Sequence, residues 1–421
     1  MKVSRYSIFT EISGRFYIYH QLTKSLIEVD KDLFSTLCKG EMNAIDPTMR
    51  DELSNMGFLL NEDINEEAVV MTANIRERFQ SKALRVTILP TLSCNFSCWY
   101  CYEKHPSTLM RQGSVPPLID FITRQASERK KDLILLDWFG GEPLLCFDKI
   151  ITPVTLELSD WCKSNGVVLH SMITTNGSLI DKDRAIQMEQ IGLRQFQITL
   201  DGGKESHNQT RFSRKIPDSY ERIIENIHLL CSHISDVSIE LRINYTPKNI
   251  ASLEEILEEF DKTIRKHITI SPHIVWQKVQ YIEELSNPIN TFLRHARNKG
   301  YKVLDFALNP RCVSCYTENS DQYVINHNLD VYKCTARDFD GKFCIGKISK
   351  DGSFIPNGLY YDYIVAKSPF VNDNCLKCEI LPTCLCSSSC IQKLLEGEQP
   401  KCYKELHKKG LYSYIKHQVN L

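Results

Sequence analysis

The sequence predicts an α/β protein whose central part is a partial barrel of six strand–helix units. Three observations carry this prediction: strand and helix patterns alternate over residues 84–304, a short hairpin-like segment precedes them, and cysteines crowd the last third of the chain. Alternating strands and helices form parallel sheets with right-handed crossovers, which close fully or partly into barrels. In such folds the chemistry lies on the loops that follow the carboxyl ends of the strands.

The composition is that of a folded chain without a global charge. The 421 residues are 42% hydrophobic, and 51 basic side chains nearly balance 52 acidic ones. We therefore expect no nucleic-acid partner, because such a partner would require a positive field. No apolar run approaches the ~18 residues that a membrane span needs, so we expect no membrane partner and a cytoplasmic location.

Residues 1–62 are predicted to form a winged-helix-like module. Three strand candidates precede two helical patterns, at 6–12, 16–20, 25–29, 31–38 and 47–56. Such a module can bind an extended peptide by strand addition, with 25–29 as the candidate edge, or it can be a plain structural cap. A polar, helix-prone stretch over 63–83 is expected to connect it to the barrel.

The barrel itself is expected over residues 84–304. Its six strand candidates are 85–89, 133–139, 168–174, 195–200, 238–244 and 268–276. One of the helical patterns between them, over 252–264, opens with the capping-box sequence Ser252-x-x-Glu255.

Cysteine is the anomaly, with 17 residues of which three lie between Cys94 and Cys101 and ten between Cys312 and Cys402. In a reducing compartment such groups indicate metal binding and not disulfides. The other four fall on apolar-periodic segments and are expected to be small buried side chains: Cys38, Cys146, Cys162 and Cys231.

The loop after the first barrel strand reads Cys94-x3-Cys98-x2-Cys101, with Tyr100 directly before the last cysteine. Three thiolates on one tight loop can hold three irons of a cubane cluster and leave the fourth iron open to a small chelating molecule. A zinc site is the alternative, although zinc would require a fourth protein ligand nearby. The position of the loop after a strand of a βα array favours the cluster.

This loop resembles that of radical S-adenosylmethionine (radical SAM) enzymes, and three later stretches agree with it. They follow the second, third and fourth strands and read Gly140-Gly141-Glu142-Pro143, Thr175-Asn176-Gly177, and Thr199-Leu-Asp201-Gly202 with Arg211. The resemblance implies that the exposed backbone of the first stretch receives the methionine amino group. It also implies that Tyr100 packs near the adenine and that Arg211 pairs with the cofactor carboxylate. The predicted cofactor-binding residues are Tyr100, Gly140, Gly141, Glu142, Pro143, Thr175, Asn176, Thr199, Asp201 and Arg211.

The resemblance further implies how the cofactors act. One electron from the reduced 4Fe-4S cluster cleaves S-adenosylmethionine, and the resulting 5'-deoxyadenosyl radical abstracts hydrogen from the substrate. The protein then has to position the substrate and exclude water, since the cofactor supplies the difficult chemistry. A reducing partner such as flavodoxin or ferredoxin is expected to supply the electron.

Residues 305–421 are predicted to form a cysteine-rich iron–sulfur domain that resembles the SPASM extension of radical SAM enzymes. By this resemblance one auxiliary 4Fe-4S cluster uses Cys312, Cys315, Cys334 and Cys390, and a second uses Cys375, Cys378, Cys384 and Cys402. The chain would then hold three clusters. One or two structural zinc sites are the alternative.

Two features depart from the pattern of that extension. Leu329 stands where the family usually has glycine, and five residues instead of three separate Cys384 from Cys390. Cys386 lies in that interval and could replace Cys384 as a ligand, while Cys344 has no assigned role.

The resemblance predicts a maturase that abstracts hydrogen from a ribosomally made precursor peptide and installs a cross-link or an oxidation. The bond could be a thioether, a carbon–carbon or a carbon–oxygen link, and residues 1–62 would bind the leader. An anaerobic sulfatase-maturase-like protein oxidase is the first alternative. In that branch an aspartate at the position of Thr335 acts as the base, so Thr335 argues against this alternative. The second alternative is a non-catalytic metal or electron-carrier protein, which would not need the Gly-Gly-Glu-Pro stretch.

Overall fold

The computed structural model describes residues 1–213, 215–275, 285–304, 315–336, 339–365, 370, 372–385, 390–398 and 402–419. The chain forms two compact units. Unit 1 comprises residues 1–81, 306–320 and 361–421, and unit 2 comprises residues 82–305 and 321–360. Cys312 and Cys386, and the end of the sixth predicted barrel strand at Trp276, lie outside the described residues.

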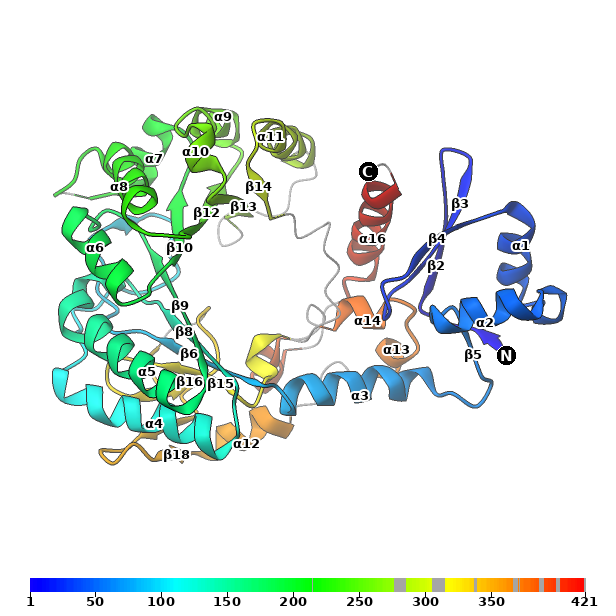
Figure 1. Ribbon diagram of the computed structural model, residues 1–421, viewed down its shortest axis with the longest axis horizontal. Coiled ribbons are helices and arrows are strands. Elements are labelled where there is room, and N and C mark those ends of the chain that lie inside the picture. The colour runs from blue at the N-terminus through cyan, green and yellow to red at the C-terminus, as the bar shows by residue number, and fades with distance from the viewer. Residues whose placement is uncertain are drawn as a thin grey trace. The chain divides into compact units, whose positions relative to one another are not determined.

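Unit 2 is built on a large, mainly parallel sheet (Figure 1), which confirms the predicted α/β fold class. Six strands pair in sequence order: β6 (Ala83–Ile88), β8 (Leu133–Trp138), β9 (Val168–Thr175), β10 (Gln195–Leu200), β12 (Ser238–Tyr245) and β13 (Ile268–Ile274). Each begins within two residues of its predicted start. A short strand, β14 (Lys302–Val303), continues the sheet beyond β13.

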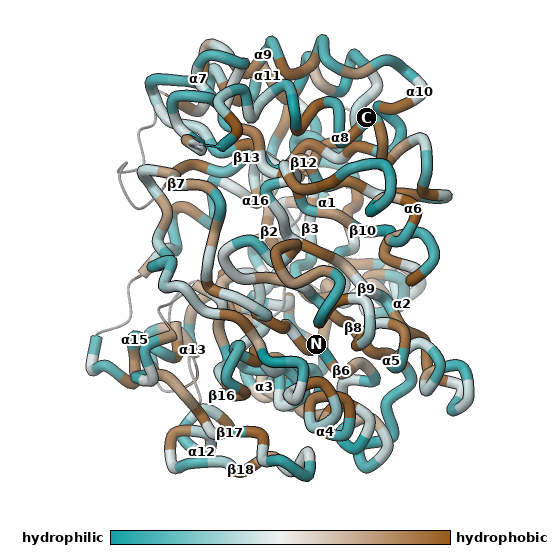
Figure 2. The backbone as a smooth tube through the Cα atoms, turned by 90° about the vertical axis from the view of Figure 1, so that its left-hand side faces the viewer, coloured by the Kyte–Doolittle hydropathy of each residue, from teal (hydrophilic) through white to brown (hydrophobic). Residues whose placement is uncertain are grey.

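Helices cover the outer face of this sheet in Figure 1. They include α4 (Val115–Glu128), α5 (Thr152–Asn165), α6 (Lys182–Gln190) and α8 (Ser219–His233). Helix α4 shows why: Leu118, Phe121, Ile122 and Gln125 recur at helical spacing and are buried. Apolar and polar stretches accordingly alternate along α4 in Figure 2. Two further helices of unit 2 are α7 (Lys204–Thr210) and α11 (Ser286–Asn298).

Four strands extend the sheet at its other edge. Strand β15 (Gln322–Ile325) pairs in parallel with β6, and three antiparallel strands follow it: β16 (Asp330–Tyr332), β17 (Gly346–Ile348) and β18 (Phe354–Pro356). Asp321 begins this extension as a buried carboxylate that pairs with Lys131 at 2.5 Å and with Arg129 at 2.7 Å. Residues that the sequence places in the cysteine-rich region therefore belong to the barrel sheet.

The prediction of one long helix over 252–264 is wrong. The structure has three short helical segments there, η5 (Ile250–Ser252), α9 (Leu253–Ile256) and α10 (Lys262–Arg265). The Ser252 hydroxyl does not cap a helix, because it donates to the Asn249 carbonyl and accepts from the Gly203 N–H. Asp261 instead caps α10 by accepting from Thr263 and Ile264.

Unit 1 combines the two ends of the chain. Its sheet has the antiparallel order β2 (Ser7–Ile12), β3 (Arg15–His20) and β4 (Leu26–Val29), and α1 (Lys31–Lys39) and α2 (Pro47–Asn55) follow, as predicted. The pair β1 (Lys2–Val3) and β5 (Leu59–Leu60) and the helix α3 (Glu66–Phe79) complete the N-terminal part. The C-terminal part contributes α13 (Asp373–Leu376), α14 (Leu381–Cys384), α15 (Ile391–Leu395) and α16 (Lys404–Val419), while α12 (Gly358–Val365) spans the boundary between the units.

The N-terminal sheet is covered on both faces within unit 1. Ile18 packs with Leu37 and Leu53 of the two helices on one face. Tyr17 and Tyr19 point to the opposite face, where they pack with Leu411 and Ile415 of α16 and with Ile380. Successive strand residues point to opposite faces, so a single strand, β3, serves both cores.

The four cysteines expected to be small core residues differ in burial. Cys146 and Cys162 are buried and Cys231 is partly buried. Cys38 is exposed, so the prediction is wrong for this residue, because α1 buries its neighbour Leu37 and turns Cys38 to the surface.

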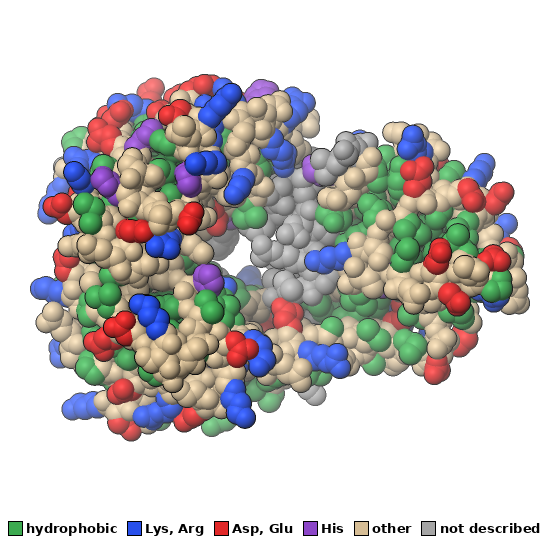
Figure 3. Space-filling model, in the orientation of Figure 1, with side chains coloured by type: hydrophobic (Ala, Val, Ile, Leu, Met, Phe, Trp, Pro, Cys, Tyr) green, Lys and Arg blue, Asp and Glu red, His purple; other side chains and the backbone are tan. Residues whose placement is uncertain are grey.

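The surface charge is mixed. On the face seen in Figure 3, acidic and basic side chains alternate over unit 2 without an extended field of one sign. Among the helices that the structure describes, none combines the length and apolar character needed to cross a bilayer.

Candidate functional site

The three-cysteine loop of unit 2 leaves the carboxyl end of β6 and is held by a small second sheet. Strand β7 (Ser97–Cys98) pairs antiparallel with β11 (Arg211–Phe212), and Cys98 lies opposite Arg211 in the register. The loop after the first strand is thereby fixed to the segment that follows the fourth. Sequence reasoning missed this pairing, because two-residue strands give no periodic signal.

The glycine pair after β8 lets two backbone segments approach closely. The N–H groups of Gly141 and Glu142 donate to the carbonyls of Thr91 and Ser93, at 3.2 and 2.9 Å. A Cβ at Gly140 or Gly141 would lie 2.3 Å from a carbonyl oxygen of this segment, and Gly140 also has φ +113°. The pair therefore seats the start of the cysteine loop. An ammonium group can only donate, so it would have to use the carbonyl oxygens of this turn, whose N–H groups are already engaged.

The Glu142 side chain ties this turn to the end of β9. Its buried carboxylate accepts hydrogen bonds from the Thr175 hydroxyl at 2.7 Å, the Asn176 N–H at 2.8 Å and the Leu144 N–H at 3.0 Å. Burial raises the pKa of Glu142 and outweighs the hydrogen bonds, which lower it. The carboxylate thus positions the turn. That the backbone of Glu142 contacts the cofactor stays a prediction.

Asn176 continues the connection to the cysteine loop. Its side-chain amide donates to the side-chain oxygen Oδ1 of Asn95 at 2.7 Å and lies 4.0 Å from the Cys94 sulfur. Asn95 in turn donates to the Ser178 hydroxyl at 2.9 Å. Of these two predicted site residues, Asn176 therefore contacts the loop that carries Cys94, whereas Thr175 is linked to it through Glu142.

The three thiols differ in exposure: Cys94 and Cys98 are partly buried, and Cys101 lies at the surface. Burial raises the pKa of Cys94 to about 12, and the pKa values of Cys98 and Cys101 are raised for the same reason. Arg211 opposes the shift of all three thiols. Binding of a metal or cluster would therefore release protons from these thiols.

His105 contacts the outermost thiol. Its Nε2 lies 3.3 Å from the Cys101 sulfur, and its Nδ1 lies 3.0 Å from the Leu92 carbonyl. A carbonyl can only accept, so Nδ1 carries a proton and fixes the ring. No feature of the sequence pointed to this residue.

A polar network forms the floor beside the loop. The buried Tyr100 hydroxyl donates to Asp201 at 2.6 Å and accepts from Arg211 at 3.0 Å and from Asn244 at 2.9 Å. Burial raises the pKa of Asp201 in spite of Arg211. Burial would lower the pKa of Arg211, but Cys98, Tyr100 and Asp201 raise it, so the guanidinium stays charged. Predicted residues from three segments of the chain therefore meet here.

Three buried polar atoms in this network have no hydrogen-bond partner among the described residues. They are Asp201 Oδ1, Arg211 Nε and His207 Nε2. Of these three residues, Asp201 lines a cavity of about 590 Å³, whose walls also include Trp99, Tyr100, Asn244, Lys248 and Asn249. This volume suits a small ligand or cofactor, and unpaired buried donors and acceptors are what such a ligand would satisfy.

Thr199 and Pro143 lie at the same edge of the sheet, and both are buried. Sequence reasoning did not name Asn244, Lys248 and Asn249, which follow the fifth strand. The rule that the carboxyl ends of parallel strands carry the chemistry could have found them, because β12 ends at Tyr245.

The donor set of the loop fits a cluster. In the described part of the chain, no three side chains of the types His, Cys, Asp and Glu form a group that could hold a single metal ion. A cubane places one thiolate on each iron, so its ligands surround a cluster instead of converging on one ion. Three thiols on one loop, beside a cavity with unpaired polar groups, have the chemistry for a cluster with one open iron.

Residues 88–260 match the Radical SAM superfamily. The chain contains a radical SAM domain. The matched segment runs from the end of β6 beyond α9, and it includes the cysteine loop, the glycine pair and the Tyr100 network. The radical SAM assignment implies S-adenosylmethionine and one 4Fe-4S cluster as cofactors.

Solved structures share the fold of this chain. Native anSMEcpe with bound AdoMet superposes with a TM-score of 0.59 at 17% identity, covering 80% of this chain and 98% of that one. Streptococcus suis SuiB bound to precursor peptide SuiA gives a TM-score of 0.53 at 15% identity, covering 96% and 98%. At these identities the likeness concerns the fold alone.

Two curated relatives are similar to part of the chain. The Fe-coproporphyrin III synthase of Methanosarcina barkeri is 24% identical over 177 residues, which are 40% of this chain. The serine-type anaerobic sulfatase-maturating enzyme of Bacteroides thetaiotaomicron is 25% identical over 162 residues, or 36% of this chain. Each alignment covers 38% of the relative's own length.

The cysteines beyond the radical SAM domain divide between the units. Burial raises the pKa of Cys375, and the neighbouring thiols of Cys384, Cys378 and Cys402 raise it further, so these four lie near one another in unit 1. Cys315 and Cys390 also belong to unit 1, whereas Cys334 belongs to unit 2.

Cys344 of unit 2 has a contact of its own. Its thiol donates to the Gly346 carbonyl at 3.1 Å and packs in an apolar cluster with Tyr332 and Phe343. Cys344 is thus a partly buried thiol packed beside an apolar cluster, and the sequence assigns it no role.

Proposed function

We propose that this chain is a radical SAM peptide maturase, which abstracts hydrogen from a ribosomally made precursor peptide and installs a cross-link or an oxidation. The observation that carries the proposal is the combination of two features in one chain. Unit 2 holds the three-cysteine loop beside a cavity with unpaired buried polar groups, and unit 1 presents a small sheet with an open edge. The likeness to SuiB covers 96% of this chain and so extends over most of residues 1–62.

The cofactor roles follow the residues described above. When bound, the cluster and S-adenosylmethionine would supply the one-electron chemistry by which a hydrogen atom is taken from the substrate. Cys94, Cys98 and Cys101 would hold the cluster. Arg211, charged and with a free Nε, would pair with the cofactor carboxylate, and the carbonyls of the Gly140-Gly141 turn would receive its amino group.

Two auxiliary 4Fe-4S clusters complete the proposed electron path. Cys375, Cys378, Cys384 and Cys402 would hold one of them, and their proximity supports this set. The second set, Cys312, Cys315, Cys334 and Cys390, stays a prediction from the sequence, because Cys312 lies outside the described residues. Iron–sulfur clusters at these sites would supply electron-transfer capacity, and we propose a flavodoxin or ferredoxin as the reducing partner.

The leader would add as a strand to β4. No described strand pairs with the outer edge of β4, and Ile27 lies opposite Ile18 of β3. The His20 N–H donates to the Ser25 carbonyl, so the alternation of antiparallel hydrogen bonds turns the Ile27 N–H inward and the Glu28 N–H outward. Glu28 and Leu26 therefore offer the backbone groups that a peptide can pair with.

A protein oxidase of the sulfatase-maturase kind is the second candidate. Its support is the 25% identity to the serine-type maturating enzyme and the fold likeness to anSMEcpe. Thr335, whose carbonyl accepts from the Tyr102 hydroxyl at 3.1 Å, cannot serve as the carboxylate base of that branch. A non-catalytic electron carrier is a weaker candidate still, because it would need neither the cavity nor the buried Arg211 network.

A direct test uses the reconstituted chain and a short peptide encoded beside its gene. With dithionite and S-adenosylmethionine under anaerobic conditions, we expect 5'-deoxyadenosine and a peptide whose mass is lower by one hydrogen pair. A sulfatase-derived serine or cysteine peptide serves as the comparison substrate. Oxidation of the sulfatase peptide alone would favour the second candidate, and an unchanged mass of both peptides would reject the proposal.

A further inference from the structure

The segment that carries Cys375, Cys378 and Cys384 packs directly on the N-terminal sheet within unit 1. Ile380 shares a core with Tyr17 and Tyr19 of β3, and the side chains of Cys378 and Cys384 lie against this core. The two helices of the segment, α13 and α14, are only four residues long each. Helices this short are not stable by themselves, so the position of the thiols must be set by what the segment packs against.

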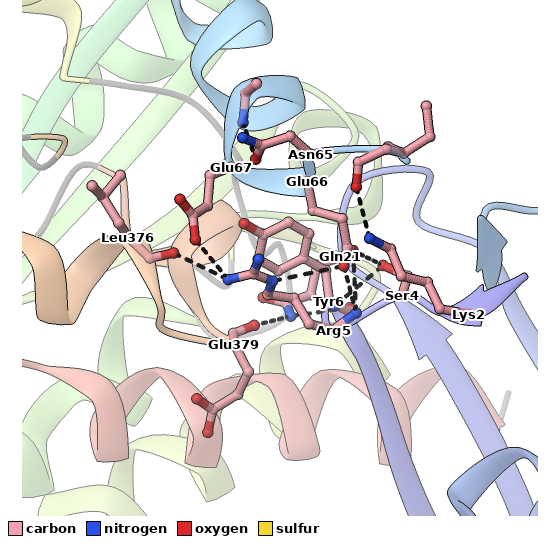
Figure 4. A network of polar contacts seen from close by, with 12 residues as sticks. Lys2, Ser4, Arg5, Tyr6, Gln21, Asn65, Glu66, Glu67, Leu376 and Glu379 are labelled. Atoms are coloured by element: carbon pink, nitrogen blue, oxygen red, sulfur yellow. Dashed lines mark hydrogen bonds and ion pairs between the residues drawn. The ribbon is translucent and has the colours of Figure 1, made fainter. Parts of the chain in front are cut away.

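Gln21, the residue after β3, is completely buried and reaches two points of this segment. Its Nε2 donates to the Glu379 carbonyl at 2.7 Å and to the Tyr6 carbonyl at 3.1 Å. Its Oε1 accepts from the Thr383 hydroxyl at 2.8 Å. Figure 4 shows Gln21 between Tyr6 and Glu379.

These contacts lie directly beside two thiols. Glu379 follows Cys378 and Thr383 precedes Cys384 in the sequence. A single buried amide therefore fixes the spacing between the second and the third cysteine of the segment. A carbonyl only accepts and a hydroxyl facing Oε1 donates, so the two ends of the Gln21 amide are not interchangeable.

Arg5 holds the beginning of the same segment. Its Nη1 donates to the Leu376 carbonyl at 3.4 Å and to the Glu67 carboxylate at 3.0 Å. The buried Glu66 of α3 accepts from the Arg5 backbone N–H at 3.1 Å. Figure 4 shows how Arg5 lies between the acidic pair of α3 and Leu376. Leu376 stands between Cys375 and Cys378, so both ends of the segment are tied to the first 21 residues of the chain.

From this geometry we propose that Gln21, with Arg5, is a positioning residue for the cluster held by Cys375, Cys378, Cys384 and Cys402. The N-terminal sheet is then part of the scaffold of an auxiliary iron–sulfur centre as well as the proposed leader-binding element. The inference rests on the proposed auxiliary cluster and goes beyond it, since nothing in the peptide-maturase function requires residues 1–21 to support a metal centre. Partners of this kind orient ligands and tune the centre that the ligands hold.

The test uses the full chain with Cys94, Cys98 and Cys101 replaced by Ala, so that only auxiliary iron remains. Gln21→Met keeps the side-chain length and removes the hydrogen bonds, and Thr383→Val removes the hydroxyl that Thr383→Ser retains. We measure iron per chain, the midpoint potential of the reduced clusters by EPR-monitored titration, and the rate of iron loss to a chelator. Gln21→Met and Thr383→Val should shift the potential of one cluster and speed its iron loss about tenfold, and Thr383→Ser should match the parent.

Two controls make the outcome decisive. Leu53→Ala removes a buried side chain from the core on the opposite face of the N-terminal sheet, away from the contacts of Gln21 and Arg5, so it reports the effect of lost stability alone. Parental iron content and potential in Gln21→Met and Thr383→Val, with stability lowered as in Leu53→Ala, would overturn the positioning role. If Gln21→Met fails to fold, the Thr383→Val and Thr383→Ser pair decides. If Cys375→Ala with Cys378→Ala retains all iron, the auxiliary cluster itself is wrong, and the inference falls with it.

Discussion

The Tyr100 hydroxyl contacts three side chains from three segments of the barrel. Asp201 follows β10, Arg211 lies in β11 and Asn244 lies near the end of β12. A hydroxyl can donate once and accept twice, and Tyr100 uses this full capacity. The family resemblance places Tyr100 beside an adenine, which stays a prediction. The hydrogen bonds of Tyr100 carry no signal in the sequence. The residue next to the last cysteine thus connects the loop to the charged floor of the cavity.

Tyr100→Phe tests this arrangement at the scale of one atom. Loss of the Tyr100 hydroxyl leaves Asp201, Arg211 and Asn244 each without one buried hydrogen-bond partner. This should lower the free energy of unfolding by about 1–3 kcal/mol. We expect about tenfold weaker binding of S-adenosylmethionine to the reconstituted chain, measured by equilibrium dialysis. Tyr102→Phe is the control, because its hydroxyl donates to the Thr335 carbonyl and the neighbouring Tyr100 donates to Asp201. Equal affinity in both variants would place the cofactor elsewhere.

His273 makes the stability of unit 2 depend on pH. Burial, and secondly Arg242, lower its pKa from 6.5 to about 4, and its Nε2 lies 3.0 Å from the Ser271 hydroxyl. The unfolded chain therefore binds a proton in a range where the folded chain does not. Stability is fully present above pH 6.5 and is lost as the pH falls toward 4.

His273→Gln should remove that dependence. Between pH 6.5 and 4 the wild-type unfolding free energy should fall more steeply than that of the variant, by at most ~1.4 kcal/mol per pH unit. Urea unfolding of the metal-free chain at several pH values measures the difference. Parallel curves for the two proteins over this range would show that His273 titrates normally.

At the scale of elements, the glycine turn after β8 seats the cysteine loop by backbone contact. Gly141→Ala would bring a Cβ to 2.3 Å from the Ser93 carbonyl, one residue before Cys94. Backbone cannot yield as a flexible side chain can, so we expect loss of about four irons per chain and of 5'-deoxyadenosine formation. Gly113→Ala is the control, because no atom lies within 4 Å of its added Cβ. Full iron in Gly141→Ala would show that the loop does not depend on this contact.

The open edge of β4 gives a second prediction at this scale. Glu28→Pro removes the outward N–H and should weaken leader binding, while cleavage of S-adenosylmethionine without peptide persists. Glu28→Ala controls for the side chain, which pairs with Arg15 and Tyr17. The sequence indicates the 25–29 edge but not which of its N–H groups point outward. The register turns the Ile27 N–H toward β3, so Ile27→Pro would break a hydrogen bond of the sheet. Undiminished peptide affinity in Glu28→Pro, measured by fluorescence anisotropy, would leave the module as a structural cap.

The buried strands were predictable, whereas the short pairings were not. Strands of a parallel sheet covered on its outer face by helices read as apolar runs, which is why all six begin close to their predicted residues. The pairing of β7 with β11 and the capping of α10 by Asp261 depend on contacts that carry no periodic signal. Leu329 is an instructive departure. It adopts φ +68° in the turn from β15 to β16, a conformation that favours the glycine usual in the family.

At the scale of the molecule, the order of segments along the chain is not their order in space. Residues 321–360 extend the barrel sheet, and the first 81 residues share unit 1 with the last 61. Local patterns cannot reveal this, because the core that joins Tyr19 to Leu411 links residues almost four hundred positions apart. The motifs at the strand ends were found because each follows its own strand. The packing of the N-terminal sheet on the Cys375–Cys384 segment became visible only in the structure.

The central claim is that Cys94, Cys98 and Cys101 hold the cluster that cleaves S-adenosylmethionine. The decisive measurement is 5'-deoxyadenosine formation together with iron content, in the variant with all three replaced by Ala and in Cys162→Ala, a buried cysteine outside the loop. The account predicts no 5'-deoxyadenosine from the triple variant while about eight of about twelve irons remain, and no loss of either in Cys162→Ala. Formation of 5'-deoxyadenosine by the triple variant at the wild-type rate would contradict it.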